Sequence, residues 1–162
     1  MKKLLIVVGT RPNFIKVTRF KKVAAARGKS DVRIVHTGQH FSKNMADVFF
    51  EQFGLAPDIF LEIGAGTPLA QMAGIMEKLE PVVLSERPDM VLVVGDVNST
   101  LAAALVANKL NVPLAHLESG LRSFDNSMPE EHNRVLTDQI TDHYFITEQS
   151  GMDNLLHDGK AK

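Results

Sequence analysis

Short runs of aliphatic and β-branched residues alternate along this chain with longer segments whose apolar residues recur at helical spacing. The short runs fall at 4–8, 32–36, 59–63, 90–94, 112–117 and 143–146, and the longer segments at 12–27, 44–53, 69–86, 98–110, 130–141 and 149–156. This order is typical of βαβ units on a parallel sheet. Because such crossovers are right-handed, helices should cover both faces. The sequence therefore predicts an α/β fold with a doubly wound parallel sheet.

Proline and glycine mark several boundaries of these segments. Pro12 suits the first helical position, and Gly28 suits the end of the same helix. Pro81 lies inside the segment 69–86 and is expected to kink or divide that helix. The run 90–94 is almost wholly apolar, which indicates a central strand covered on both faces.

Acidic residues follow two of the predicted strands and open one predicted helix. Asp96 and Glu118 come shortly after the apolar runs 90–94 and 112–117, and Glu130 begins the segment 130–141. Open α/β sheets bind ligands at the carboxyl ends of their strands. Carboxylates gathered in one crevice can be tuned apart by burial and mutual repulsion, which suits proton transfer at carbon. We therefore expect a catalytic site at this edge.

Each of the three carboxylates also has an ordinary structural interpretation. Asp96 lies in a stretch of Asp, Asn and Ser residues, one of which is expected to cap the following helix. Glu118 could form a structural ion pair with Arg122. Ser127 followed three residues later by Glu130 matches a capping box. Both interpretations remain open for each residue taken alone.

Two further turns carry polar residues to the same edge. The turn GTRP leads into a helix N-terminus, where backbone N–H groups favour an anion and Arg11 and Lys16 could add positive charge. It is not a G-x-G-x-x-G fingerprint, so a nicotinamide cofactor is not expected. Gln39 and His40, after the second strand, could hydrogen-bond a sugar or a diphosphate. The alternatives are an ordinary turn capped by Thr10 or Arg11, and an exposed histidine.

The bulk composition narrows the class of protein. At 162 residues, with 44% hydrophobic and 23% charged residues, the chain suits one globular domain. The net charge of -1 gives no support for nucleic acid or a membrane surface as partner. No run is long enough to span a membrane and no signal peptide is recognised, so a cytoplasmic location is expected.

No metal site is expected. The chain contains no cysteine, which removes disulfides and thiolate ligands. His116 and Glu118 have a spacing seen among metal ligands, but no motif places a third ligand beside them.

Read together, the segments GTRPNFIK, HTGQHF, GDVNSTLA, HLESGLRSFDNSMPEEHNR and LTDQITDHYF resemble the non-hydrolysing UDP-N-acetylglucosamine 2-epimerases over nearly the whole chain. The resemblance implies that residues 1–162 form the amino-terminal Rossmann-like half of a GT-B-type two-domain enzyme. The carboxyl-terminal nucleotide-binding domain would then be absent from this chain. We accordingly expect the isolated chain to be inactive or nearly so, and the full-length protein to be a homodimer.

The resemblance also implies a reaction and its residues. The family removes the C2 proton while UDP departs from C1, forming a 2-acetamidoglucal, and then returns UDP as the proton is delivered from the other face. No cofactor is implied. Asp96, Glu118 and Glu130 match the acidic catalytic trio. The residues matched to substrate binding are Arg11, Lys16, Gln39, His40 and Arg122.

The substrate is less closely specified. Where the family commonly reads RPEAIK this chain has Asn13 and Phe14, and these variants resemble a subgroup that includes epimerases of UDP-diacetamido-glucuronates. UDP-N-acetylglucosamine and such a uronate are therefore both candidate substrates. A GT-B glycosyltransferase, a hydrolysing epimerase and a non-catalytic module are the further alternatives, because a fold does not determine function.

Overall fold

The computed structural model describes residues 1–38, 48 and 51–160. Its strands form one six-stranded sheet in the order β3-β2-β1-β4-β5-β6, with every neighbouring pair parallel. The strands are β1 (Lys2–Val8), β2 (Ser30–His36), β3 (Ile59–Phe60), β4 (Met90–Val94), β5 (Leu114–Leu117) and β6 (His143–Phe145). This is the strand order of the Rossmann fold. The predicted doubly wound parallel sheet is confirmed.

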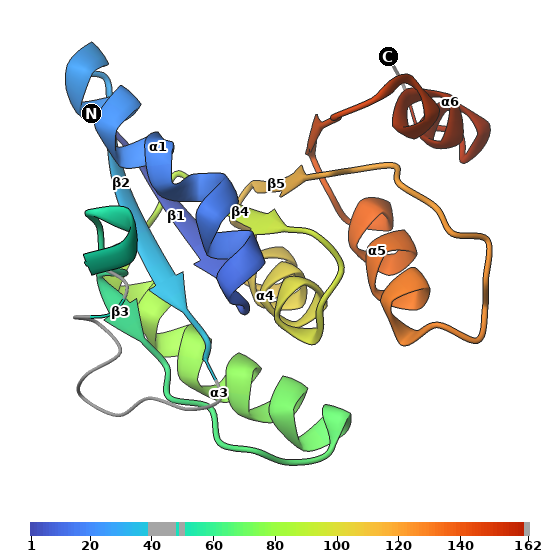
Figure 1. Ribbon diagram of the computed structural model, residues 1–162, viewed down its shortest axis with the longest axis horizontal. Helices are drawn as coiled ribbons and strands as arrows, with labels where there is room; N and C mark the ends of the chain where they lie inside the picture. Colours follow the sequence, from blue (N-terminus) through green and yellow to red (C-terminus); the bar gives the residue numbers. More distant parts are fainter. Residues whose placement is uncertain (39–47, 49–50, 161–162) are drawn as a thin grey trace.

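Helices connect the strands and cover the sheet (Figure 1). They are α1 (Arg11–Arg27), α3 (Pro68–Glu86), α4 (Asn98–Lys109), α5 (Pro129–Gln139) and α6 (Gln149–His157). The expected helix 44–53 falls largely outside the described residues, although 51–53 are helical. None of the helices described is both long and apolar enough to cross a membrane.

Two hydrophobic cores lie on opposite faces of the sheet. Alternate residues of β1 divide between them, with Leu5 and Val7 in one core and Ile6 and Val8 in the other. The first core is closed by α3 and α4, and the second by α1. This division follows from the period of two in a strand, which sends successive side chains to opposite faces.

The ends of α1 follow their sequence signals. The Thr10 hydroxyl oxygen accepts a hydrogen bond from the Asn13 N–H at 3.5 Å, and Pro12 occupies the first turn. Gly28 ends the helix at φ 61°, a left-handed conformation that glycine adopts without steric cost. The helix N-terminus is thereby placed at the carboxyl end of β1.

Pro81 does not divide α3. The helix runs unbroken from Pro68 to Glu86, with Pro81 on its exposed side. Ile75, Leu79 and Val83 are buried along the opposite stripe, on both sides of the proline. Their burial in the first hydrophobic core keeps the helix continuous across the proline.

The third strand is shorter than expected. Its pairing with β2 ends at Phe60, because Glu62 has φ 52° and leaves the extended conformation. The chain continues to follow β2 by single hydrogen bonds, from Leu61 N–H to His36 O at 3.0 Å and from Ile63 N–H to Thr37 O at 3.2 Å.

Candidate active site at the carboxyl edge of the sheet

The carboxyl ends of β1 and β4 are neighbours at the centre of the sheet, where the strand order reverses direction. Ligands of open α/β sheets bind in the crevice at such a switch point. The turns after these strands are tied together, since the Asn13 side-chain amide donates to the Val94 carbonyl oxygen at 3.1 Å. A Cβ on Gly9 would lie 2.2 Å from the Ser99 hydroxyl oxygen, so the close approach requires glycine. The two turns therefore form one wall of the candidate site.

Asp96 lies in the turn between β4 and α4 and forms an ion pair with Arg134 of α5. Arg134 also contacts the Glu131 carboxylate at 3.2 Å. Beside this pair, the Asn133 side-chain amide donates to the backbone oxygen of Asp96 at 3.0 Å and to the Asn98 side-chain oxygen at 3.2 Å. These contacts join α5 to the turn that carries Asp96.

The capping interpretations of Asp96 and Glu130 are wrong. Apolar residues occupy the N-cap positions of α4 and α5, and within the described part of the chain neither helix receives a side-chain cap. The Ser127 hydroxyl, expected to cap α5, donates to Asp125 at 2.6 Å instead. Neither carboxylate is therefore used to begin a helix.

Glu118 has a strained backbone at the end of β5. Its φ is 75°, a left-handed value that costs a non-glycine residue free energy and is often found at functional sites. Its carboxylate pairs with Lys16 of α1 at 2.7 Å, while Arg122 pairs with Asp138 and Asp158, so the alternative structural pair of Glu118 with Arg122 is not formed. The second oxygen, Oε2, lies 3.5 Å from a Cβ built on Gly95, beside the turn that carries Asp96. The fold thus brings Glu118 to the same edge of the sheet, beside the turn that carries Asp96.

Glu130 and Glu131 occupy adjacent positions in the first turn of α5 but play different roles. Glu130 is partly exposed, and among the residues described its carboxylate has no hydrogen-bond or ion-pair partner. Glu131 is 4% exposed and accepts hydrogen bonds from the N–H groups of Ser123 and Phe124 at 2.9 and 3.1 Å. Burial raises the pKa of Glu131, but these bonds and the Arg134 charge outweigh it and leave the pKa below its usual range. Glu131 therefore stabilises the loop before α5 rather than facing solvent.

The residues matched to substrate binding divide into three groups. Arg11 is exposed, with its guanidinium 5.8 Å from the centre of the Phe53 ring, and Lys16 contacts Glu118. The Arg122 side chain is 4% exposed, because it binds Asp138 at 2.7 Å and Asp158 at 2.8 Å. Gln39 and His40 lie outside the described residues.

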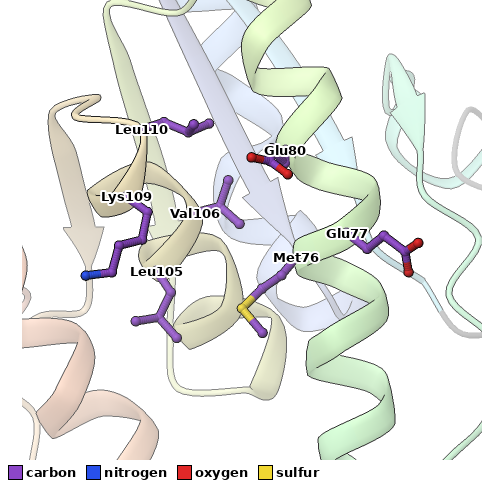
Figure 2. A pocket seen from close by; sticks show the side chains of 7 residues that line it. All are labelled: Met76, Glu77, Glu80, Leu105, Val106, Lys109 and Leu110. Atoms are coloured by element: carbon purple, nitrogen blue, oxygen red, sulfur yellow. The ribbon is translucent and has the colours of Figure 1, made fainter.

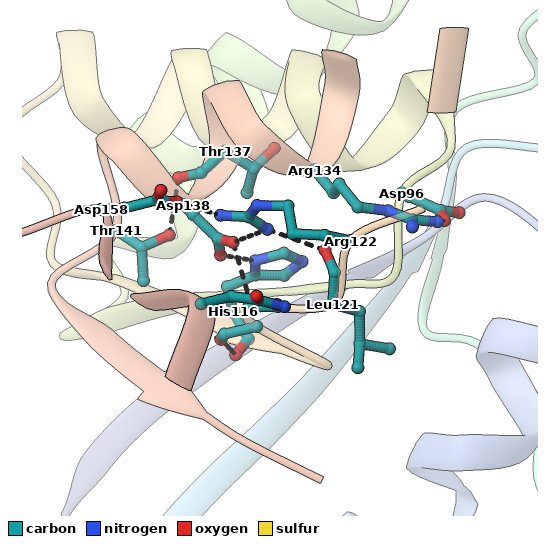
Figure 3. A network of polar contacts seen from close by, with 12 residues as sticks. Asp96, His116, Leu121, Arg122, Arg134, Thr137, Asp138, Thr141 and Asp158 are labelled. Atoms are coloured by element: carbon teal, nitrogen blue, oxygen red, sulfur yellow. Dashed lines mark hydrogen bonds and ion pairs between the residues drawn. The ribbon is translucent and has the colours of Figure 1, made fainter. Parts of the chain in front are cut away.

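Sequence reasoning missed Arg134 and the buried pair of His116 and Asp138, which is shown in Figure 3. Arg134 stands three and four residues after the two glutamates of α5, a spacing that puts all three on one side of a helix. That spacing was the available signal. No comparable sequence signal marks Asp138 as the partner of His116, because α5 meets β5 only through tertiary packing.

A groove of about 250 Å³ lies elsewhere, between α3 and α4 (Figure 2). It is lined by Met76, Glu77, Glu80, Leu105, Val106, Lys109 and Leu110. It contains none of the residues predicted for catalysis or substrate binding. In addition, the described residues include no group of three or more His, Asp or Glu side chains that could hold a metal ion.

The family profile described as UDP-N-acetylglucosamine 2-epimerase matches residues 22–162. The chain belongs to this family. A UDP-2,3-diacetamido-2,3-dideoxy-D-glucuronate 2-epimerase of Pseudomonas aeruginosa is 50% identical over 159 residues, which cover 97% of this chain and 45% of that protein. A UDP-N-acetylglucosamine 2-epimerase of Methanocaldococcus jannaschii is 47% identical over 158 residues, with 97% and 43% covered.

Solved structures of 2-epimerases share the fold. The Methanocaldococcus jannaschii enzyme in complex with UDP-GlcNAc and UDP superposes with a TM-score of 0.89 at 46% identity, covering 98% of this chain and 44% of that one. The Neisseria meningitidis enzyme bound to UDP-GlcNAc has a TM-score of 0.90 at 31% identity, with 98% and 43% covered. The chain thus spans less than half the length of the 2-epimerases that it matches.

Proposed function

We propose that this chain is the amino-terminal half of a non-hydrolysing 2-epimerase that converts UDP-N-acetylglucosamine to UDP-N-acetylmannosamine. The observation that supports the proposal is that, in a chain of this family, Asp96 and Glu118 follow the carboxyl ends of β4 and β5, while Glu130 lies in the first turn of α5, the helix whose Arg134 pairs with Asp96. The activity is proposed for the native-length protein, because the chain covers 43–45% of the relatives described above. These residues alone are expected to turn over little substrate.

The proposed reaction is an elimination followed by an addition. One carboxylate removes the C2 proton while the C1–O bond to UDP breaks, which leaves a 2-acetamidoglucal and UDP. The C1–O bond then reforms as an acid delivers a proton to the other face of C2. Each direction needs one base and one acid near C2. Of the three carboxylates, Glu130 has no partner among the described residues, while Asp96 and Glu118 each face a cation.

The departing diphosphate needs positive charge. Lys16 and Arg11 are carried by the first turns of α1, whose N-terminus points its free N–H groups towards the crevice. Preorganised donors of this kind stabilise charge that develops on a leaving group. We propose that they bind the diphosphate, with Gln39, His40 and Arg122 retained as candidate contacts to the rest of the UDP-sugar.

A second substrate has specific support. The chain is 50% identical to the Pseudomonas aeruginosa diacetamido-glucuronate epimerase and 47% identical to the Methanocaldococcus jannaschii N-acetylglucosamine enzyme. We test both by incubating the native-length protein separately with each UDP-sugar and following the manno product and free UDP. Conversion of either establishes the epimerase, and the ratio of the two kcat/KM values identifies the substrate. Release of UDP with free sugar and no epimer would contradict the proposal.

We also propose that the native-length protein is a cytoplasmic homodimer. The groove between α3 and α4 supports a contact between copies, because it has apolar walls with Glu77 and Glu80 on α3 and Lys109 on α4. In a two-fold pairing the acidic helix of one copy can face the lysine of the other. Light scattering on wild type and Leu105→Glu tests this; the variant should be monomeric, and an unchanged dimer would exclude this face.

A further inference from the structure

His116 is a fully buried side chain near the site, and both of its ring nitrogens are hydrogen-bonded. Figure 3 shows the bond to Asp138. Nε2 lies 2.7 Å from the Gly95 carbonyl oxygen, and Nδ1 lies 2.7 Å from Asp138 Oδ1. A carbonyl oxygen can only accept, so Nε2 must carry a proton. The bond to Asp138 holds one further proton between the two groups.

The surroundings of Asp138 place that second proton on the histidine. Burial raises the pKa of Asp138, but hydrogen bonds and charge from His116 and Arg122, with the Gly120 N–H, outweigh it and leave the pKa below its usual range. Asp138 Oδ2 accepts from Gly120 N–H at 3.0 Å and from the Arg122 guanidinium at 2.7 Å, and these two contacts favour the ionised carboxylate independently of His116, which leaves Oδ1 without a proton to donate. Its Oδ1 therefore accepts from Nδ1–H.

The remaining charged and titratable groups around this pair are consistent with an imidazolium. Arg122 is balanced by Asp158, at 2.8 Å, as well as by Asp138. The Tyr144 hydroxyl donates to the backbone oxygen of Asp138 at 3.0 Å and adds no charge. Two cations and two carboxylates thus form a neutral cluster, which is the condition under which buried charges are tolerated.

The cluster touches both turns that carry predicted catalytic carboxylates. His116 holds the carbonyl of Gly95, the residue directly before Asp96. The Ser119 hydroxyl donates to the His116 carbonyl, and Asp138 holds the Gly120 N–H, so the residues after the strained Glu118 are fixed as well. Resting on the proposed epimerase function, we propose that His116, protonated on both ring nitrogens and paired with Asp138, is the residue that positions Asp96 and Glu118.

Two variants and one matched control test the positioning role by kinetics in the native-length protein. Asp138→Asn and His116→Gln should lower kcat by about 10- to 100-fold, because a displaced carboxylate loses much of its effect. The KM of His116→Gln should change by less than about threefold, since this variant leaves Arg11, Lys16 and both carboxylate partners of Arg122 in place. Asp142→Asn is the control: Asp142 accepts the Leu114 N–H at 2.8 Å at the opposite end of β5, and its kcat should be unchanged.

Nitrogen NMR of the 162-residue chain reads the protonation directly and does not depend on turnover. At pH 7 the wild type should show His116 with protons on both ring nitrogens, and Asp138→Asn should leave only Nε2–H. The backbone amide signals of Asp96 and Glu118 should move in Asp138→Asn and stay in place in Asp142→Asn. A neutral His116 in the wild type, unmoved Asp96 and Glu118 signals, or equal kcat values for the Asp138 and Asp142 variants would each overturn the proposal.

Failure of the underlying function gives a different pattern. A wild-type protein that epimerises neither UDP-sugar would contradict the proposed function. The NMR signals would in that case still decide whether His116 is an imidazolium that fixes the two turns.

Discussion

Asp96 and Arg134 come from segments 38 residues apart, yet they form the pair that joins α5 to the centre of the sheet. Arg134 bridges Asp96 and Glu131 with its two terminal nitrogens. A planar guanidinium can hold two carboxylates at once, whereas a lysine ammonium acts as a single point charge. At the scale of single residues, Arg134 therefore orients the Asp96 carboxylate, whereas His116 holds the backbone directly before it.

Replacing Arg134 should impair catalysis more than folding. We expect Arg134→Gln to lower kcat by about 100-fold, since Asp96 loses its orienting partner, and Arg134→Lys to recover part of that loss. Steady-state kinetics of the native-length protein provide the measurement. Arg19→Gln, on the exposed side of α1, is the control and should retain wild-type kcat. Equal kcat in the Arg134 and Arg19 variants would remove Arg134 from the site.

His36 should make stability depend on pH. It is buried, and burial lowers its pKa to about 4. The unfolded histidine takes up its proton near pH 6.5, so stability that is present above that pH is lost as the pH falls towards 4. The loss is on the order of 3 kcal/mol across this window. Urea unfolding of wild type and His36→Gln at pH 7 and pH 5 measures the change in unfolding free energy between the two pH values. An equal change in both proteins would contradict the assignment to His36.

At the scale of elements, the first turn of α5 carries two glutamates with different roles: Glu131 is structural, and Glu130 is the catalytic candidate. Glu131→Gln should destabilise the chain by about 1–3 kcal/mol, because it weakens the buried carboxylate that binds the N–H groups of the preceding loop and the Arg134 guanidinium. Glu130→Gln is its matched control, and its stability should lie within about 0.5 kcal/mol of wild type.

In activity the order of the two variants should be reversed, with Glu130→Gln losing more than Glu131→Gln. Loss of a general acid or base lowers kcat by about 10²- to 10⁴-fold, and this is expected for Glu130→Gln. Chemical unfolding and steady-state kinetics on both variants provide the comparison. A Glu130 variant with full activity, or one as unstable as the Glu131 variant, would exclude the proposed division of roles.

A close backbone contact anchors α6 to the turn that follows Glu118. A Cβ on Gly120 would lie 2.1 Å from the Gly151 carbonyl oxygen, whereas a Cβ on Gly159 would meet nothing within 4 Å. Both glycines have positive φ, so the cost of alanine at Gly159 measures the conformational strain alone. We expect about 1 kcal/mol for Gly159→Ala and about 3 kcal/mol for Gly120→Ala. Equal unfolding free energies would show that the contact is not tight.

The sequence predicted the elements better than their ends and their partners. Alternation of apolar runs was sufficient for the sheet, and Pro12 and Gly28 marked the limits of α1 because caps act locally. Pro81 does not divide α3 as one of the two expected outcomes had it, since buried residues on both sides of it keep the helix continuous. The third strand was overestimated because the left-handed backbone at Glu62 has no signature in the hydrophobic pattern.

For the candidate site, too, the sequence indicated where residues lie better than which partners they contact. The acidic residues could be assigned to the carboxyl edge, because strand ends of a parallel sheet share one side. Which cation each would face depends on how α1 and α5 pack, and this is tertiary information. Glu118 consequently pairs with Lys16 rather than Arg122, and Arg122 pairs with Asp138 and Asp158.

At the scale of the whole molecule, the strand order brings four turns to one edge of a Rossmann sheet. The first and fourth strands meet there, with the N-terminus of α1 on one side and α5 on the other. The cations Arg11 and Lys16 come from α1, and the carboxylates come from the turns after β4 and β5 and from α5, an arrangement that suits departure of an anion from a carbon beside the one losing its proton. The family relationship and the geometry thus favour the same chemistry.

The most direct measurement is solvent exchange at C2. The native-length protein is incubated with UDP-N-acetylglucosamine, and separately with the diacetamido-glucuronate, in deuterated water and followed by proton NMR. Our account predicts loss of the C2 proton signal together with appearance of the manno epimer for at least one of them, and loss of both effects in Glu130→Gln. A folded wild-type protein that leaves the C2 proton of both substrates in place would contradict it.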